Sequence, residues 1–378
     1  MLLGKIPKDF DVATSATPEE VQEVFPRCRL IGRRFRLAHV RKGGALIEVA
    51  TFRGSSDDDR DHEKDNGRIV RDNVFGTVEE DAIRRDFTIN ALFLDPVSGE
   101  IRDYVGGFED LTQRHLRLIG DPEVRYREDP VRLLRAARFE AKLGVSPDEV
   151  TEGPIRSMAR LLKNVPPARL FEEVCKLFLT GHGVRSMEAL QRFGLSTALF
   201  PGIKKGSGKG KIQIGVVLRQ TLENTDDRIK QGKPVTPAFL FAALLWQPLA
   251  DRSKALVESG ETEYNAMMSA SEEVILTQVQ ITAVPRRFSA VTRQIWSMQV
   301  RFNKTRGKRW KRLLHEQRFR AGYDFLLLRA IEDPSLEPLC EFWTTAQEGI
   351  DFSKNSFNRP NEGRQRPRRR YKRRSPSS

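Results

Sequence analysis

The sequence predicts an α+β domain at its N-terminal end, an all-α region after it and a disordered basic tail. Segments with period-two alternation and β-branched residues are confined to about the first 115 residues. From Asp129 onward, apolar residues recur at helical spacing, and several of these segments end near glycines. The last residues, 351–378, are rich in arginine and poor in apolar side chains, which is typical of disorder.

Charge is spread unevenly along the 378 residues. Lys and Arg total 65 against 51 Asp and Glu, a formal net charge of +14. Residues 351–378 hold ten cations and two acids, so the tail carries +8 and the rest of the chain 14 − 8 = +6. This favours a polyanionic partner, nucleic acid first and an anionic membrane second. A solubility tail or a basic localisation signal is the other interpretation of residues 351–378.

The cysteines and the hydropathy pattern exclude several classes of protein. Cys28, Cys175 and Cys340 lie far apart and form no ligand spacing with the five histidines, which argues against a disulfide framework and a zinc site. The longest apolar run, residues 238–246, has nine residues, whereas about 20 are needed to cross a bilayer. The chain turns charged after its first three residues, unlike a signal peptide. A reducing, cytoplasmic setting without a membrane partner is expected.

The first elements are predicted as strand, helix and strand. DFDVAT (9–14) and ALIEVATF (45–52) read as strands, and the helix between them has Thr17 as N-cap and Pro18 at its first position. Asp9 and Asp11 are two residues apart on a strand, so they share a face and can converge on Mg²⁺. Pairs of metal-binding carboxylates of this kind are typical of nucleotidyl-transfer sites, although two solvated surface acids can have the same spacing. The acid-dense segment 54–67 predicts a solvated loop.

A second polar cluster lies in EEDAIRRDFTINALFLD (79–95). We expect a helix in which Asp86 and Asn90 share one face, preceded by Arg84 and Arg85. Guanidinium groups bind phosphate oxygens bidentately, so neighbouring arginines suit a triphosphate. An ordinary exposed helix with internal ion pairs would carry similar residues.

A third cluster lies in REDPVRLLRAARF (127–139), at the start of the helical region. Asp129 is a candidate N-cap and Pro130 suits the first helical position. Arg132, Arg135 and Arg138 then recur every three residues and form a cationic stripe. The stripe is either a solvated basic face or a contact for a nucleotide or RNA.

These segments, taken in order, resemble the class II nucleotidyltransferase family shared by CCA-adding enzymes and bacterial poly(A) polymerases. The resemblance implies a polymerase-beta-like α+β head over residues 1–120, a helical neck over 121–200, a helical body over 201–350 and the tail over 351–378. The later segments TPAFLFAALLWQPL and KRWKRLLHEQRFRAGYDFLLLRA are similar to the poly(A) polymerase branch. The motifs that carry the family resemblance are LLGKIPKDFDVAT, IGRRFRLAHV, IEVATFRG, RRDFTINAL, RDYVGG, LRLIGDP and YREDPVRLLRAARFEAKLG.

The resemblance also implies roles for individual residues. Asp9 and Asp11 are expected to bind metal with Glu48 as a third acid, and Asp86 is expected to belong to the catalytic site. Arg85 and Asn90 are expected on the ribose and triphosphate of ATP. The remaining candidates, which present hydrogen bonds to the base or support the base pocket and the phosphates, are Asp129, Arg132, Arg135 and Arg138.

The implied reaction is template-independent polyadenylation. The RNA 3′ hydroxyl attacks the α-phosphate of ATP, pyrophosphate leaves, and AMP is added with Mg²⁺, or Mn²⁺, as cofactor. The implied partners are RNA 3′ ends and, through the basic tail, proteins of RNA degradation, and a monomer is expected. The alternatives are a CCA-adding tRNA nucleotidyltransferase, which also takes CTP and stops after three additions, and a catalytically impaired RNA-binding protein.

One departure from the family pattern has two competing explanations. A segment resembling Gly-Gly-x-Val-Arg-Asp is expected just before LLG, whereas this sequence begins at Met1-Leu2-Leu3-Gly4. The family's glycines let the backbone approach the triphosphate. The favoured explanation is that the true start lies upstream of an internal methionine. If the head is instead shortened, the catalytically impaired RNA-binding protein becomes the leading interpretation.

Overall fold

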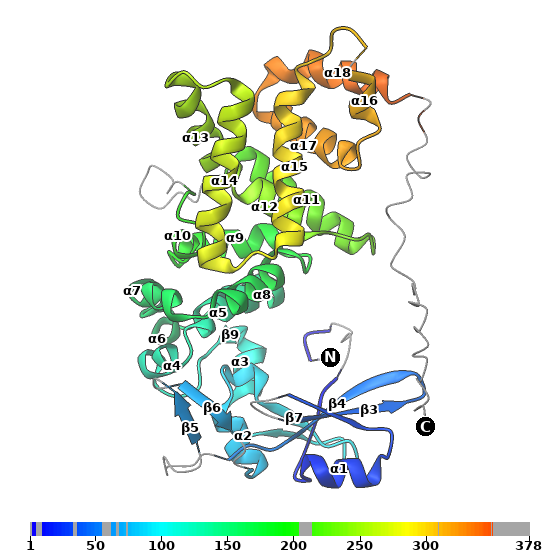
Figure 1. The fold of residues 1–378 in the computed structure, drawn as a ribbon. Helices are drawn as coiled ribbons and strands as arrows, with labels where there is room; N and C mark the ends of the chain where they lie inside the picture. Colours follow the sequence, from blue (N-terminus) through cyan, green and yellow to red (C-terminus); the bar gives the residue numbers. More distant parts are fainter. Residues whose placement is uncertain are drawn as a thin grey trace, which may run out of the picture.

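The computed structural model of the chain describes residues 2–4, 10–32, 36–54, 62–65, 68–72, 75–203, 214–308, 310–348 and 350. Strands gather at one end of the molecule and helices fill the other (Figure 1). A mixed α and β head therefore precedes a helical neck and body, which confirms the predicted fold class. The predicted disordered tail, residues 351–378, lies outside the described residues.

The head is built on a mixed four-stranded sheet in the order β1-β4-β3-β2. β1 runs parallel to β4, whereas β4 with β3 and β3 with β2 are antiparallel. Helix α1 (Pro18–Val24) follows β1 and packs Val21 into a small apolar cluster with the sheet. Its predicted cap is confirmed, because Thr17 and Glu20 form a capping box. The strands are β1 Val12–Thr14, β2 Arg29–Ile31, β3 Leu37–Lys42 and β4 Ala45–Thr51.

Short elements complete the head and lead to the neck. β7 and β8 pair antiparallel, as do β5 and β6, and β9 pairs parallel with β10 from beyond the neck's first helices. The elements are β5 His62–Asp65, β6 Arg68–Asp72, α2 Val78–Arg84, the 3₁₀ turn η1 Thr88–Asn90, β7 Leu92–Leu94, β8 Ile101–Asp103, α3 Gly107–Gln113, β9 His115–Leu116 and β10 Ser146–Pro147.

The neck and body are helical. The elements are α4 Pro122–Glu128, α5 Val131–Leu143, α6 Glu149–Glu152, α7 Ile155–Met158, η2 Ala159–Asn164, α8 Pro167–Phe178, α9 Gly183–Arg192, α10 Ser196–Leu199, α11 Val216–Lys230, α12 Pro237–Leu244, α13 Trp246–Glu258, α14 Glu263–Thr282, α15 Arg286–Phe302, α16 Trp310–Leu314, α17 Phe319–Glu332, η3 Pro334–Leu336 and α18 Glu337–Ala346. In Figure 1 the neck helices α4 to α8 lie between the head and the remaining helices.

The expectation of a loop over residues 54–67 is wrong in part. β5 lies inside this segment and pairs with β6 as an antiparallel hairpin. The dipeptide Asn66-Gly67 separates the two strands in sequence and is a strong hairpin signal. The high density of acids in the segment concealed that signal.

The predicted helix through Asp86 and Asn90 is also wrong. α2 ends at Arg84, the backbone of Arg85 is extended, and Asn90 ends η1. The reason is pairing with a later segment: the Asp86 carbonyl accepts from Ile119 N, and the Thr88 amide donates to Arg117. Phe87, between them, is fully buried. Burial of this aromatic side chain overrides the helical pattern.

One large apolar core runs through the neck and body and takes in part of the head. It includes Phe87 and Leu118 from the head, Leu134 of α5, Phe178 of α8 and Trp296 of α15. The run predicted as a buried helix forms α12, and the Trp296 indole donates to a carbonyl of that helix, at Ala242. Among the described residues, no helix is long and apolar enough to span a membrane.

The buried carboxylate of Asp226 fixes the start of α9 against α11. The Gly183 amide donates to both of its oxygens, at 2.8 and 2.9 Å. This replaces the missing local cap, since no side chain at the N-cap position bonds to α9. A Cβ on Gly183 would lie 3.3 Å from Asp226 Oδ1, so the close approach favours glycine.

Replacing Asp226 by Ala should lower the free energy of unfolding by about 1–3 kcal/mol, because a buried amide donor loses its partner. Asp227→Ala is the matched control. Asp227 is exposed and pairs with Lys230 on the surface of α11, so its loss should leave stability almost unchanged. Urea denaturation measures both variants, and equal losses would contradict the capping role.

Candidate functional site

Asp11 and Glu48 lie next to each other across the sheet. β1 pairs with β4 in parallel register, Val12 opposite Val49, and continuing this register by one residue puts Asp11 opposite Glu48. Residues opposite each other on neighbouring strands point to the same face. Asp11 is exposed, and Glu48 is half exposed with one carboxylate oxygen 3.3 Å from His39 Nε2. Asp9 lies outside the described residues.

Asp11 and Glu48, at the β1 edge of the sheet, can supply part of the coordination shell of Mg²⁺. Within the described ranges no group of three or more His, Cys, Asp or Glu side chains is placed to hold a metal. Asp11 and Glu48 nevertheless supply hard carboxylate oxygens. Mg²⁺ is ordinarily held by one or two protein carboxylates with waters and substrate phosphates completing its shell, so two carboxylates suffice for the protein's share.

A pocket of about 570 Å³ lies between the head and the neck. The residues after α2 form one wall, α5 forms a second, and α8 contributes one side chain. Five arginines face two carboxylates in its lining, so the pocket favours an anionic ligand. The lining residues are Arg85, Asp86, Asn90, Asp129, Arg132, Arg135, Arg138, Phe139 and Arg169. Every predicted nucleotide-binding residue is among them, together with Asp86.

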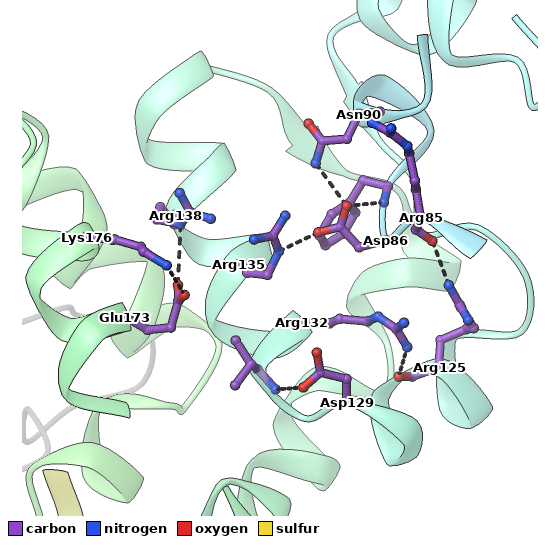
Figure 2. Close-up of polar contacts among 12 residues, drawn as sticks. Arg85, Asp86, Asn90, Arg125, Asp129, Arg132, Arg135, Arg138, Glu173 and Lys176 are labelled. Carbon is purple, nitrogen blue, oxygen red and sulfur yellow. Dashed lines mark hydrogen bonds and ion pairs between the residues drawn. The ribbon is translucent and has the colours of Figure 1, made fainter. Parts of the chain in front are cut away.

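Asp86 is the polar centre of the pocket (Figure 2). One carboxylate oxygen accepts from Asn90 Nδ2 at 3.0 Å and from the Phe87 amide at 2.9 Å. The other oxygen accepts from Arg135 Nε. Burial alone would raise the pKa of Asp86, but the charge of Arg135 and these hydrogen bonds outweigh it and lower the pKa. The carboxylate is therefore ionised and committed to protein partners at neutral pH.

Arg85 is held on the head side of the pocket. Its Nε and Nη2 donate to Asp81 Oδ2 at 3.1 and 2.9 Å, and its Nη1 donates to the Asn90 carbonyl at 2.9 Å. The guanidinium lies over the Phe93 ring, 4.6 Å from its centroid. These contacts fix the orientation of the guanidinium before any ligand arrives.

Asp129 and Arg132 sit on the neck side, at the junction of α4 and α5. The prediction of Asp129 as N-cap and Pro130 as first helical residue is wrong by one position, because α5 begins at Val131 with Pro130 as its N-cap. Asp129 is the C-cap of α4, and its Oδ1 accepts from the Val131 amide at 3.3 Å. The carboxylate also accepts two hydrogen bonds from Arg169 of α8, at 2.9 and 2.7 Å. Arg132 Nη1 donates to the Arg125 carbonyl at 2.6 Å and to Glu128 at 3.0 Å.

Arg135 and Arg138 extend the cationic wall along α5. Both guanidinium groups lie over the Phe139 ring, with carbon-to-centroid distances of 5.2 and 4.8 Å. Arg138 also faces the buried Glu173 of α8, with 3.6 Å between Nε and the carboxylate. Burial lowers the pKa of Arg138, and the charge of Glu173 opposes that shift. The cationic stripe read from the sequence therefore faces the pocket.

Four residues of this site were not predicted from the sequence. Arg169 and Phe139 line the pocket, Glu128 orients Arg132, and Arg125 contacts both walls. Glu128 carried a signal, because it adjoins Asp129 in the same short motif. Arg169 meets Asp129 across 40 residues of sequence, and no local pattern predicts such a contact.

The ion pair of Asp86 and Arg135 predicts a pH dependence of stability. The pKa of Asp86 is lowered by folding, so its contribution is fully present above the unfolded value of about 3.9 and is lost as pH falls through the lower folded pKa. Asp86→Asn should therefore lower the free energy of unfolding by roughly 2–4 kcal/mol at pH 7. The difference in free energy of unfolding between the variant and the unsubstituted chain should shrink below about pH 4. Urea denaturation at pH 3 to 7 measures it, and a difference independent of pH would contradict the assignment.

Three family models match the sequence. "Poly A polymerase head domain" matches residues 1–117, "Probable RNA and SrmB- binding site of polymerase A" matches 144–206, and "Polymerase A arginine-rich C-terminus" matches 259–376. The first match contains Asp9, Asp11, Glu48 and Asp86, and the second contains Arg169. Of the pocket lining, Arg85, Asp86 and Asn90 fall in the first match and Arg169 in the second, whereas the lining residues of 129–139 fall between the two matches.

Solved structures of similar fold are tRNA-processing enzymes. A Bacillus stearothermophilus CCA-adding enzyme in complex with CTP is 25% identical, with a TM-score of 0.56 over 92% of this chain and 75% of that one. A tRNA nucleotidyltransferase complexed with a primer tRNA and an incoming ATP analog is 21% identical, with a TM-score of 0.55 over 91% of both chains. The latter likeness is one of fold alone.

Sequence relatives separate the two branches of the family. A CCA-adding enzyme of Lactobacillus helveticus is 38% identical over 56% of this chain and 51% of its own length. Poly(A) polymerase I of Haemophilus influenzae is 45% identical over 91% of this chain and 78% of its own length. For poly(A) polymerase I of Salmonella typhi the identity is 45% over 99% of this chain and 84% of that relative. With this similarity extending along almost its entire length, the chain belongs to the poly(A) polymerase family.

Proposed function

We propose that this protein adds AMP from ATP to RNA 3′ ends without a template. The observation that carries the proposal is the pocket in which the head residues Arg85, Asp86 and Asn90 meet the neck arginines. Its cationic lining suits a triphosphate, and two of its side chains, Asp129 and Arg132, have the hydrogen-bonding groups to read a base. Family membership supplies the reaction class.

The reaction joins the RNA 3′ oxygen to the α-phosphorus of ATP and breaks the bond to pyrophosphate. Asp9, Asp11 and Glu48 would hold the metal at the edge of the sheet. Mg²⁺, or Mn²⁺ in its place, would activate the attacking hydroxyl and stabilise the leaving oxygen. The protein's remaining contribution is positioning: Arg85 and the α5 arginines orient the phosphates, and the neck orients the base.

We assign Asp86 a positioning role in this reaction. Its two oxygens are already occupied by Arg135, Asn90 and a backbone amide, so it organises the pocket and leaves metal binding to the strand acids. The sequence-based expectation that Asp86 is catalytic stays a prediction. Loss of activity in Asp86→Asn would not separate the two roles, whereas a loss of ATP affinity in the absence of metal supports positioning.

The base specificity is the point at which a CCA-adding enzyme would differ. Asp129 and Arg132 can serve adenine or cytosine through hydrogen bonds alone, so the proposal for ATP rests on the 45% identical poly(A) polymerase relatives. Messenger RNA as substrate, a cytoplasmic location and a monomeric state stay predictions. Partner contacts stay predictions as well: the tail lies outside the described residues, and the family model that mentions SrmB covers residues 144–206.

Primer extension on a short unstructured RNA, with Mg²⁺ and one nucleotide at a time, tests the function. A long ladder with ATP alone is expected. Addition limited to three nucleotides, with CTP also required, would indicate the CCA-adding alternative. Absence of extension despite retained RNA binding would overturn the proposal in favour of a non-catalytic RNA-binding protein.

Asp11→Ala tests the metal-binding acids. The variant should lose activity by on the order of 10³-fold, because one of the carboxylates that would hold the metal at the reacting phosphate is gone, while RNA affinity stays the same. Glu23→Ala, an exposed acid at the end of α1, is the control and should keep full activity. An active Asp11→Ala enzyme would rule out this metal assignment.

A further inference from the structure

Arg125 lies behind the pocket and is not part of its lining. It belongs to α4, and its side chain is only 16% exposed. A buried guanidinium is costly unless its donors are paired, so the partners of Arg125 indicate why the position holds a cation. The neighbouring Arg127 on the same helix is 58% exposed and pairs with Glu123 on the surface.

The side chain of Arg125 is hydrogen-bonded to the head wall of the pocket, which is the segment that contains Arg85, Asp86 and Asn90. Its Nη2 donates to the carbonyl of Arg84 at 2.8 Å and to that of Arg85 at 2.6 Å. These two carbonyls stand at the C-terminal end of α2, where backbone acceptors lack partners within the helix and carry partial negative charge. Asp86, the polar centre of the pocket, is the next residue. These two hydrogen bonds therefore fix the backbone that carries Arg85 and Asp86.

The main chain of Arg125 supports the neck wall. Its carbonyl accepts from Arg132 Nη1 at 2.6 Å. Glu128, one turn further along α4, accepts from Arg125 at 2.8 Å and from Arg132 at 3.0 Å through the same carboxylate oxygen. Figure 2 shows Arg125 joined by dashed lines to the Arg85 carbonyl and to the Arg132 guanidinium. One residue thus bonds to both walls, which lie about 40 residues apart in the sequence.

We infer that Arg125 is a positioning residue that sets the spacing between the head wall and the neck wall of the nucleotide pocket. A planar guanidinium can reach two carbonyls and a carboxylate at once, whereas a lysine ammonium lacks this fork. Loss of the fork frees the segment of Arg85 and Asp86 to move relative to Arg132. A displacement of about 1 Å in a positioning group can cost up to ~10²-fold in rate.

The inference rests on the proposed function in one respect, that the ligand of the pocket is a nucleotide. Arg125→Gln removes the charge and the fork, Arg125→Lys keeps the charge alone, and Arg127→Gln is the surface control on the same helix. Binding of ATP is measured directly by equilibrium dialysis without RNA, and steady-state extension gives KM for ATP and kcat. RNA affinity is measured separately by filter binding.

Arg125→Gln should weaken ATP binding and raise KM for ATP about tenfold, and Arg125→Lys should do so about threefold. The RNA affinity of both variants should stay within about twofold of that of the unsubstituted chain. Arg127→Gln should keep ATP affinity, KM for ATP and RNA affinity within about twofold. Unchanged ATP affinity in folded Arg125→Gln would overturn the inference. Equal loss of ATP and RNA affinity would also overturn it, because it would indicate general loosening of the fold. If Arg125→Gln does not fold, the Lys variant decides by the same criteria.

A double-substitution cycle tests whether Arg125 acts through the head wall. If it positions Asp86, Asp86→Asn and Arg125→Gln together should weaken ATP binding less than the product of their separate effects. If the effect of the double variant equals the product of the two separate effects, Arg125 does not act through Asp86, and this part of the inference is wrong. If the unsubstituted chain binds ATP but extends no RNA, the proposed activity fails, yet dialysis still tests Arg125.

Discussion

The partly buried ion pair between Asp86 and Arg135 joins the head to the neck at the centre of the pocket. Directly beside it, Phe87 packs edge-on against Phe139, with 5.6 Å between ring centroids. Two adjacent residues of the head therefore meet two residues of α5, one pair by charge and one by apolar contact. The apolar contact belongs to the large core, so the charged pair is held by packing that extends deep into the body.

This arrangement explains why the pocket is both polar and well defined. Buried ions are tolerated when each has a partner, and the partners here come from different elements. Arg85 is paired with Asp81, Arg138 faces Glu173, and Asp129 is paired with Arg169. The guanidinium groups are thereby oriented in advance, which reduces the ordering cost when a ligand binds.

Much of the fold followed from local patterns, because capping residues and hydrophobic spacing act over a few positions. The Thr17 capping box, the buried run of α12 and the arginine stripe of α5 are of this kind. Apart from the local hairpin of β5 and β6, the failures share one physical cause, which is pairing with distant segments. The chain after Arg84 leaves the helix because it pairs with residues 117–119, and Arg169 reaches Asp129 from a separate helix. Most residues of the pocket could be predicted, but Phe139, Arg169 and the mutual contacts could not.

Five arginines and two carboxylates line the pocket, and this net positive charge has a thermodynamic consequence. Each guanidinium has a carboxylate partner, but the lining as a whole is net positive, so binding of a polyphosphate is electrostatically favourable and, because only the folded chain forms the pocket, is linked to folding stability. That gain depends on phosphate charge and is the same for every nucleoside triphosphate. Discrimination between bases must therefore come from a separate and smaller free-energy difference, superimposed on an affinity that is largely indifferent to the base.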